Sequence, residues 1–350
     1  WIKIGNIQRK YVDEADEYIT QAGLEGSSAK MLSAGTILFT IFATLGEVGI
    51  LTIEACTNQA IAGITIKNQS DILTDYLYYF LKSQKSCIAA LGRGVAQNNI
   101  NLSILRNFEV PIPDLPMQKQ IVAILDKTAK VVEVRQQQLQ QLDELVKARF
   151  VELFGDGNHP HIALIDLIIE GAGLSYGIVQ PGDDGTGDMG VLRPVDMVDG
   201  KISTASIKYI DRSIGDGFKK TELYGDELLI TVRGTTGITA LTDIRFNGMN
   251  VTRGIAVVRY DRNKINPVYL NAYLNTDESQ RYIQEHTRGA TLQQINLSDL
   301  RVQQIMVPPL ALQEQMAAFI EQTDKSKVAV QKALDEAQLL FDSLMQKYFG

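Results

Sequence analysis

The chain has 350 residues, of which 45% are hydrophobic and 21% are charged, proportions typical of a globular protein with more than one domain. Its formal net charge of -7 provides no basic footprint, so contact with nucleic acid would depend on local basic patches or on a partner. Two cysteines, Cys56 and Cys87, exclude a disulfide framework, and we expect a cytoplasmic protein. We find no signal peptide, and the most apolar stretch, from Thr36, is too short and interrupted to cross a membrane.

Residues 1–113 mix short strands with one helix. The apolar run ILFTI from Ile37 predicts a strand. The stretch DILTDYLYYFLKS from Asp71 predicts a short helix, and its aromatic face indicates core packing.

Residues 114–155 predict one long helix. Pro116 stands at its start and Gly155 just past its end, and neither proline nor glycine interrupts the run between Met117 and Arg149. Apolar residues recur at alternating spacings of four and three, which is the heptad seam of paired helices. The apolar seam positions are Ile121, Leu125, Val132, Leu139, Leu142 and Val146.

Residues 156–308 predict a second globular region, with strands in ELLITV from Glu227 and GIAVVRY from Gly254. The stretch GTGDMG at Gly185 fits a phosphate-binding loop, but VLRPVDM follows it and predicts a strand where the loop needs a helix. Asn266-Pro-Val-Tyr resembles the Asn-Pro-Pro-Tyr motif of amino-methyltransferases. Because Asn-Pro also begins helices, we interpret it as a helix cap.

Residues 309–350 predict a second long helix and complete an internal repeat. NLSILRNFEVPIPDLPMQKQ from Asn101 corresponds to NLSDLRVQQIMVPPLALQEQ from Asn296, and the spacing between the copies stays constant to Gly155 and Gly350. The second seam contains Met316, Ile320, Val330, Leu334, Phe341 and Leu344. The second seam has the same phase as the first, which favours an antiparallel pair of helices. The alternative is two separate helices, each covering its own domain. Upstream the repeat is looser, and the first region lacks a counterpart of residues 158–190.

No catalytic constellation stands out in the sequence. His159, His161 and His286 do not combine with the two cysteines in a zinc-binding spacing, and no acidic pair is singled out for acid–base chemistry. We therefore expect a protein that is not an enzyme by itself.

The repeated connectors, NLSILRNFEVPIPDLPMQKQIVAILD and NLSDLRVQQIMVPPLALQEQMAAFIE, resemble those of the specificity subunit of type I restriction–modification enzymes. The resemblance covers the whole chain. It implies an α+β protein with two target-recognition domains in pseudo-twofold repeat, joined by two long antiparallel coiled-coil helices. The domains would be 1–113 and 156–308, and the connectors 114–155 and 309–350. WIKIGNI from Trp1 would be a strand inside a first domain that lacks its N-terminal part.

The resemblance also implies a division of labour. Each domain would recognise one half of a split double-stranded DNA target, while the helices act as a spacer and as the docking site for methyltransferase (M) subunits. S-adenosylmethionine would be bound by the M subunits and no cofactor by this chain, and a restriction/translocase (R) subunit would join for cleavage. The alternative is a coiled-coil scaffold that joins partners without binding DNA.

Candidate DNA contacts are basic or amide side chains in or beside predicted loops. In the first domain they are Lys3, Arg9, Lys10, Arg93, Gln97 and Asn98, and in the second Lys219, Lys220, Arg233, Arg253, Arg288, Gln293 and Gln294. For each residue the alternative is an ordinary solvated side chain. We assign the matched Arg106 and Arg301 to structure, and the matched Gln118 and Gln313 either to capping a helix or to meeting a partner.

Overall fold

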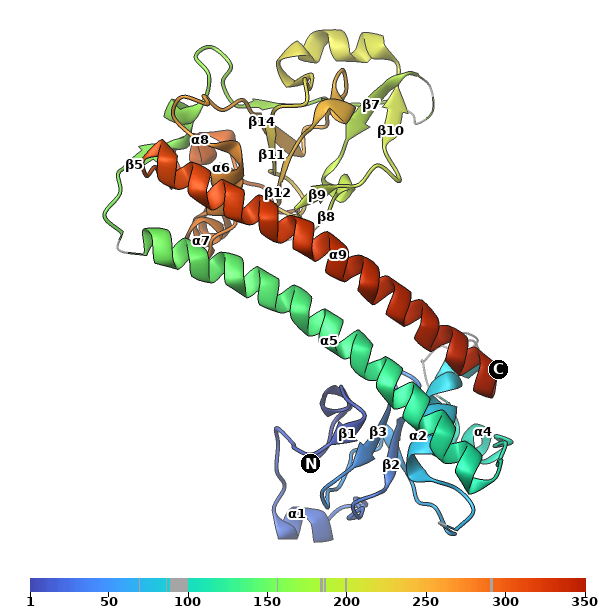
Figure 1. Cartoon of the computed structure of the whole chain (residues 1–350). Helices are drawn as coiled ribbons and strands as arrows, with labels where there is room; N and C mark the ends of the chain where they lie inside the picture. Colours follow the sequence, from blue (N-terminus) through green and yellow to red (C-terminus); the bar gives the residue numbers. More distant parts are fainter. Residues whose placement is uncertain are drawn as a thin grey trace. The chain divides into compact units, whose positions relative to one another are not determined.

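The computed structural model describes residues 1–68, 70–85, 87–88, 100–155, 157–182, 185, 187–198, 200–289 and 292–350. Its internal contacts divide the chain into two compact units (Figure 1). The first unit contains Trp1–Leu139 and Ala329–Gly350, and the second contains Gln140–Val328. Each unit therefore includes part of both long helices, α5 (Leu115–Phe154) and α9 (Leu310–Phe349).

The first unit is built on a four-stranded sheet in the order β1-β3-β2-β4. β2 is antiparallel to β3 and to β4, and β1 joins the edge parallel to β3. The strands are β1 (Tyr11–Val12), β2 (Ile37–Thr40), β3 (Val48–Leu51) and β4 (Ile61–Ile64), and the helices besides α5 and α9 are the 3₁₀ turn η1 (Ile4–Asn6), α1 (Gln21–Glu25), α2 (Thr74–Ser83) and α4 (Leu102–Arg106). α2 covers the sheet with the aromatic face predicted for it, and Tyr76, Tyr79 and Phe80 are buried there.

The prediction of a strand in WIKIGNI is wrong. Ile2 makes a single parallel bridge to Thr57, and the chain then turns through η1. The side chain of Asn6 causes the turn, because its Oδ1 accepts a hydrogen bond of 2.9 Å from the Lys3 amide. Such local side-chain bonds compete with extended structure.

The second unit contains several small sheets around three buried apolar clusters. The largest sheet has the order β12-β11-β14-β6, a second has the order β10-β7-β13, and β15-β5 and β8-β9 form pairs. The strands are β5 (His161–Ala163), β6 (Ser175–Tyr176), β7 (Met189–Leu192), β8 (Met197–Val198), β9 (Lys201–Ile202), β10 (Lys208–Ile210), β11 (Leu228–Thr231), β12 (Thr239–Leu241), β13 (Asn250–Val251), β14 (Ile255–Val258) and β15 (Gln304–Met306). The helices besides α5 and α9 are η2 (Leu164–Leu167), η3 (Pro194–Asp196), η4 (Arg212–Thr221), η5 (Ile244–Phe246), α6 (Pro267–Leu274), α7 (Asp277–His286) and α8 (Leu297–Val302).

Two local predictions in this unit are confirmed. The chain after the glycine-rich stretch at Gly185 forms the strand β7, which excludes the phosphate-binding loop. Asn266 is the N-cap of α6, and its side chain accepts from the amides of Val268 and Tyr269 at 2.9 and 3.2 Å.

The predicted long helices are confirmed, and each has 40 residues, or about 60 Å of helix. Within the second unit the helices run antiparallel, since Asp143 pairs with Lys327 while Arg149, further along α5, lies over Phe319, further back along α9. Within the first unit Phe341 and Met345 of α9 join the core that contains Ile121 and Leu125 of α5. Every predicted seam position in both helices is buried or half-buried.

The repeat is most closely kept where each long helix begins. Gln118 is buried; its Oε1 accepts from the Leu73 amide before α2, and its Nε2 donates to the carbonyls of Asp71 and Pro113. Gln313 is buried in the same way, accepting from Asn266 and donating to the carbonyls of Lys264 and Pro308. The two glutamines therefore link the start of each long helix to the loop that precedes α2 or α6. Of the two roles considered for them, capping a helix or meeting a partner, the buried bonds favour a structural one.

Candidate nucleic-acid interface

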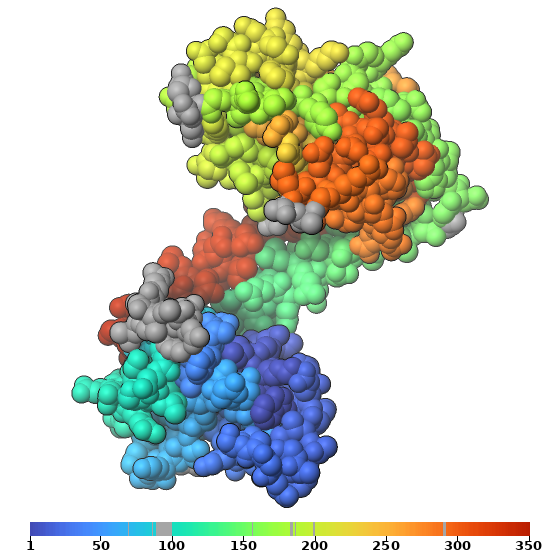
Figure 2. All heavy atoms as spheres, turned by 180° about the vertical axis from the view of Figure 1, so that it is seen from behind, coloured from blue at the N-terminus to red at the C-terminus, as the bar shows by residue number. Residues whose placement is uncertain are grey.

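Three segments of the second unit meet at one place on its surface. Gly234, in the loop after β11, donates its amide to the Gln293 carbonyl at 2.9 Å. Arg288 and Gln294 exchange two backbone hydrogen bonds of 2.8 Å each. The Val232 amide donates to the Gly254 carbonyl at 2.8 Å, which brings in the residues before β14. Backbone pairing therefore gathers five of the sequence-predicted residues, namely Arg233, Arg253, Arg288, Gln293 and Gln294. In Figure 2 the orange segment that contains α6, α7 and the chain near Arg288 forms part of the surface of this unit.

The side chains of this group are accessible. The side chain of Arg288 is 74% exposed and has one long ion pair, of 4.0 Å, with Asp299. Arg253 and Gln293 are exposed and Arg233 is half-buried. Within the described part of the chain neither Arg233 nor Arg253 has an ion pair through its side chain. Guanidinium and amide groups side by side provide the donors and acceptors that recognise guanine and adenine edges in the major groove. We call these five residues the arginine–glutamine cluster.

Tight turns hold the cluster in place. Gly234 and Gly237 have positive φ angles of 86° and 88°, as a short connection between β11 and β12 requires. The hydroxyl of Thr231 accepts from the Ile238 amide at 2.9 Å and closes the same turn. At Gly289, with φ of 100°, a Cβ would lie 2.3 Å from the Leu292 carbonyl oxygen, so glycine is required there.

The structure places Lys219 and Lys220 apart from this cluster. Both are exposed in the last turn of η4. The Lys220 carbonyl accepts from the guanidinium of Arg259 at 2.6 Å, and Arg259 directly follows β14, whereas Arg253 precedes it. The two lysines therefore lie toward the opposite end of β14, where they remain candidates for phosphate contact.

In the first unit the predicted cations are close to acidic groups. The ammonium of Lys3 pairs with Glu17, and Arg9 is exposed within electrostatic range of Glu133. Arg93, Gln97 and Asn98 lie outside the described residues. The structure therefore assembles no counterpart of the arginine–glutamine cluster from the predicted residues that it describes in this unit.

Lys10, proposed from the sequence as a DNA contact, is instead part of an internal network. Its ammonium lies 2.7 Å from Asp75 and 2.5 Å from Asp126, with the Tyr79 ring centroid 4.9 Å away. Burial lowers the pKa of Lys10, but the hydrogen bonds to both carboxylates outweigh burial and raise the pKa above its usual value. Burial likewise raises the pKa of Asp75, and hydrogen bonds from Lys10 and Tyr11 reverse this and hold it below its usual value. A cation paired in this way is poorly placed to meet a phosphate.

Sequence reasoning missed the two residues that stand at the positions of Arg233 and Arg253 in the first unit. The Ile100 amide donates to the Ile41 carbonyl as Ile295 does to Val232, so Phe42 stands where Arg233 stands in the second unit. Ile41 donates to Ala60 as Val232 does to Gly254, which places Gln59 at the position of Arg253. Phe42 is 38% exposed and Gln59 is exposed. In the sequence, ILFTIFATLG from Ile37 resembles LLITVRGTTG from Leu228, which aligns Phe42 with Arg233 but does not extend to Gln59.

Among the described residues no group of three or more His, Cys, Asp or Glu side chains could hold a metal ion. None of the described helices is apolar over a length sufficient to cross a membrane.

The comparisons with known proteins all identify the same family. Residues 1–144 and 188–337 match the family model described as the type I restriction modification DNA specificity domain. The chain is 22% identical to the type I restriction enzyme EcoBI specificity subunit of Escherichia coli, over 84% of this chain and 69% of that protein. It is 20% identical to the MjaIX specificity subunit of Methanocaldococcus jannaschii, over 98% of this chain and 83% of that protein.

Solved structures show the same fold. The crystal structure of the S subunit of a type I restriction–modification system from M. genitalium matches with a TM-score of 0.58 and 16% identity, covering 98% of this chain and 89% of that chain. A chain from a structure on complex assembly and conformational transition of the type I R-M system matches with a TM-score of 0.57, covering 99% of this chain and 90% of the other. The fold class predicted from the sequence is therefore confirmed.

Proposed function

Because the chain belongs to the type I restriction modification DNA specificity family, with two specificity domains, we propose that it recognises a split target in double-stranded DNA, one unit to each half. The observation that carries this proposal is the arginine–glutamine cluster, whose exposed or half-buried side chains are brought together by backbone hydrogen bonds in the second unit. In the first unit Phe42 and Gln59 occupy the matching positions, so the two units would prefer different bases.

The proposed complex includes M subunits that dock on the long helices and hold S-adenosylmethionine for adenine methylation, together with an R subunit. Exposed apolar residues away from the seam support docking there, since Val328, Leu339 and Leu340 of α9 are 63%, 69% and 53% exposed. The net charge of -7 also favours shared DNA contact, in which the M subunits supply part of the positive field. Such a complex would work on DNA in the cytoplasm, with no cofactor on this chain and no membrane involved.

The first experiment is to isolate the chain from its native cells under gentle salt and to identify by mass spectrometry what accompanies it. An adenine methyltransferase among the partners, and preference of the complex for particular duplexes, are the expected results. Absence of a methyltransferase, or a complex with no duplex preference, would favour a scaffold that does not bind DNA.

A second experiment tests the lysine pair. In the assembled complex Lys219→Ala with Lys220→Ala should weaken binding to all duplexes and lower the slope of log affinity against log salt by about one unit per lost phosphate contact. Lys30→Ala with Lys67→Ala, which also removes two exposed lysines, is the matched control and should leave the slope unchanged. A slope unchanged from that of the unaltered complex would remove Lys219 and Lys220 from the interface.

A further inference from the structure

In the second unit Arg253 lies between two other segments of the chain. Its amide donates to the Ile178 carbonyl at 2.9 Å, and Ile178 forms a parallel bridge with Thr252. On the opposite edge β13 pairs parallel with β7, and the Thr252 amide donates to the Leu192 carbonyl at 2.9 Å. The chain directly after Ile178 and the chain directly after β7 therefore flank Arg253.

Val179 points to the same face as Arg253. Successive side chains of an extended chain alternate between two faces, and residues paired across neighbouring strands share a face. Because Ile178 and Thr252 form the pair, Val179 and Arg253, which follow them, both point to the other face. Burial agrees, since Ile178 is fully buried, whereas Val179 is 50% exposed and Arg253 is also exposed.

The turn η3 places a second valine on the other flank of Arg253. A Cβ on Gly254 would lie 2.6 Å from Cγ of Pro194, so the glycine that follows Arg253 lets this turn approach closely. Val195 comes directly after Pro194 and is 70% exposed. Two exposed valines therefore lie beside one exposed arginine.

A buried carboxylate anchors the turn that carries Val195. Asp196 is fully buried and accepts hydrogen bonds from the Arg193 amide at 2.8 Å and from the Ser206 hydroxyl at 3.1 Å. The Arg193 guanidinium donates to the same carboxylate at 3.0 and 3.1 Å. These bonds fix the backbone on both sides of Val195.

The first unit keeps this turn but not its apolar side chain. In η1 the Lys3 amide donates to Oδ1 of Asn6 at 2.9 Å, which corresponds to the bond that begins η3. Gly5 therefore stands at the position of Val195. The two units thus differ at this position in the apolar surface that they present.

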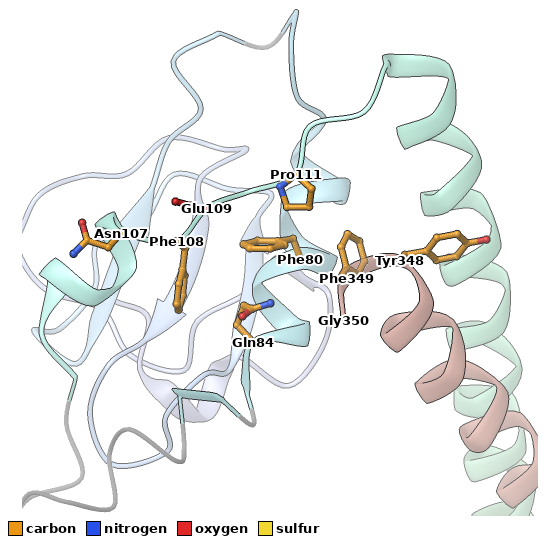
Figure 3. Close-up of a pocket in the computed structure, with 9 residues that line it drawn as sticks. All are labelled: Phe80, Gln84, Asn107, Phe108, Glu109, Pro111, Tyr348, Phe349 and Gly350. Carbon is orange, nitrogen blue, oxygen red and sulfur yellow. The ribbon is translucent and has the colours of Figure 1, made fainter.

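A pocket of about 440 Å³ in the first unit offers no comparable surface. Figure 3 shows the Phe80 ring there between the rings of Phe108 and Phe349, at centroid distances of 6.4 and 6.1 Å. None of the described residues that line this pocket is basic. It provides apolar contact without the guanidinium that accompanies the two valines.

We propose that Val179 and Val195 contact the 5-methyl groups of thymines in the major groove, on base pairs at or next to the one that Arg253 contacts. This inference rests on the proposed recognition function and adds a base preference to it. The thymine methyl group projects into the major groove, where an apolar side chain distinguishes it from cytosine. Neighbouring strands lie about 4.8 Å apart, and successive base pairs about 3.4 Å apart. Side chains from three adjacent segments therefore reach the same or adjacent base pairs.

An apolar protein surface is the other partner that two exposed valines could meet. Arg253 lies between them, and its guanidinium forms no ion pair with a described residue. Covering it with an apolar surface would bury a charge without a partner, which is costly. A guanine edge offers two acceptors to the same guanidinium, so the combination favours DNA.

The test uses the chain assembled with its methyltransferase partner and a target selected from a randomised duplex pool. Each thymine of that target is replaced in turn by deoxyuridine, which removes the methyl group and leaves base pairing unchanged. We expect affinity to fall about fourfold at the contacted thymines, the value of burying one methyl group. In Val195→Ala or Val179→Ala the deoxyuridine penalty should disappear at the thymine that the altered valine contacts.

Ile169→Ala is the matched control. Ile169 is 51% exposed, and its amide donates to the carbonyl of Arg259, at the opposite end of β14 from Arg253. This variant should keep the affinity of the unaltered complex and every deoxyuridine penalty.

Three results would overturn the inference and leave the recognition function intact. They are a selected target in which no thymine shows a penalty, penalties that persist undiminished in both valine variants, and weaker assembly of either variant with the methyltransferase in the absence of DNA. The last result would make the valines a protein contact. A complex without any duplex preference would instead contradict the recognition function, and this inference with it.

Discussion

At the residue scale, Gln118 and Gln313 form the same set of hydrogen bonds in the two units. Each buried side-chain amide accepts a hydrogen bond from one backbone amide and donates to two backbone carbonyls. An unsatisfied buried polar group costs about 1–3 kcal/mol. Both copies of the repeat therefore carry glutamine because each must bond one backbone amide and two backbone carbonyls.

We predict that Gln118→Ala or Gln313→Ala lowers the free energy of unfolding of its own unit by about 2–4 kcal/mol, because three hydrogen bonds made by a buried side chain are lost and its place is left empty. Urea denaturation measures the change. Gln120→Ala and Gln315→Ala, also matched in the repeat but exposed, are the controls and should stay within about 0.5 kcal/mol. Equal effects in both pairs would argue against the buried bonds as the cause.

The network of Lys10 predicts a pH dependence of stability. The lowered pKa of Asp75 means that its contribution is present at neutral pH and is lost as pH falls below the ordinary value of 3.8 and through the folded value. The raised pKa of Lys10 means that its contribution is complete below the ordinary value of 10.5 and is lost as pH rises through the folded value.

Lys10→Met should therefore lower the melting temperature at neutral pH and reduce its further fall at both extremes, as measured by calorimetry across pH. Lys3→Met is the control, because Lys3 and Glu17 form an exposed pair whose side chains are 46% and 54% accessible. If the melting temperature of Lys10→Met varied with pH in parallel with that of the unaltered chain, the Lys10 network would not cause the pH dependence.

At the element scale, the long helices show what local sequence can determine. Their starts at proline, their ends before glycine and their heptad seams are all encoded within a few neighbouring residues, and each was predictable. Strands of two residues, such as β1 and β13, carry no periodic signal. The partners of Lys10 lie 65 and 116 positions away in the chain, so its role required the fold. The arginine–glutamine cluster was named residue by residue, but its assembly depends on pairing between three separate loops.

The heptad seam of α5 predicts that a buried seam residue contributes more to the free energy of unfolding than an exposed residue of the same helix. Leu125 is 0% exposed in the core of the first unit, so Leu125→Ala should lower the free energy of unfolding by about 3 kcal/mol. Lys127→Ala, an exposed position on the same helix, is the control and should stay within about 0.5 kcal/mol. Similar losses from both, by urea denaturation, would contradict a buried seam.

At the scale of the whole molecule, each unit has its own apolar cores and its own set of exposed side chains. Two of the cluster positions differ in charge between the units, since Arg233 and Arg253 in the second unit correspond to Phe42 and Gln59 in the first. The molecule thus carries two different surfaces on a repeated framework.

We therefore predict that Arg233→Ala, assembled in the complex, relaxes base preference in one half of the target and leaves the other half unchanged. Each lost bidentate contact should reduce discrimination by about 1–3 kcal/mol. Selection of bound duplexes from a randomised pool measures both halves at once. Loss of preference in both halves would show that the surfaces do not act independently.

The hydrogen bonds of Gln118 and Gln313 have a further consequence for the evolution of such a protein. Since Gln118 and Gln313 make the same bonds to the same kinds of backbone group, the joint forms these bonds with two different globular domains. A genetic crossover at the start of either long helix would join a foreign domain to a helix whose glutamine can form the same hydrogen bonds with it. New specificities could then arise by exchange of whole domains, with the glutamine hydrogen bonds at the joint retained.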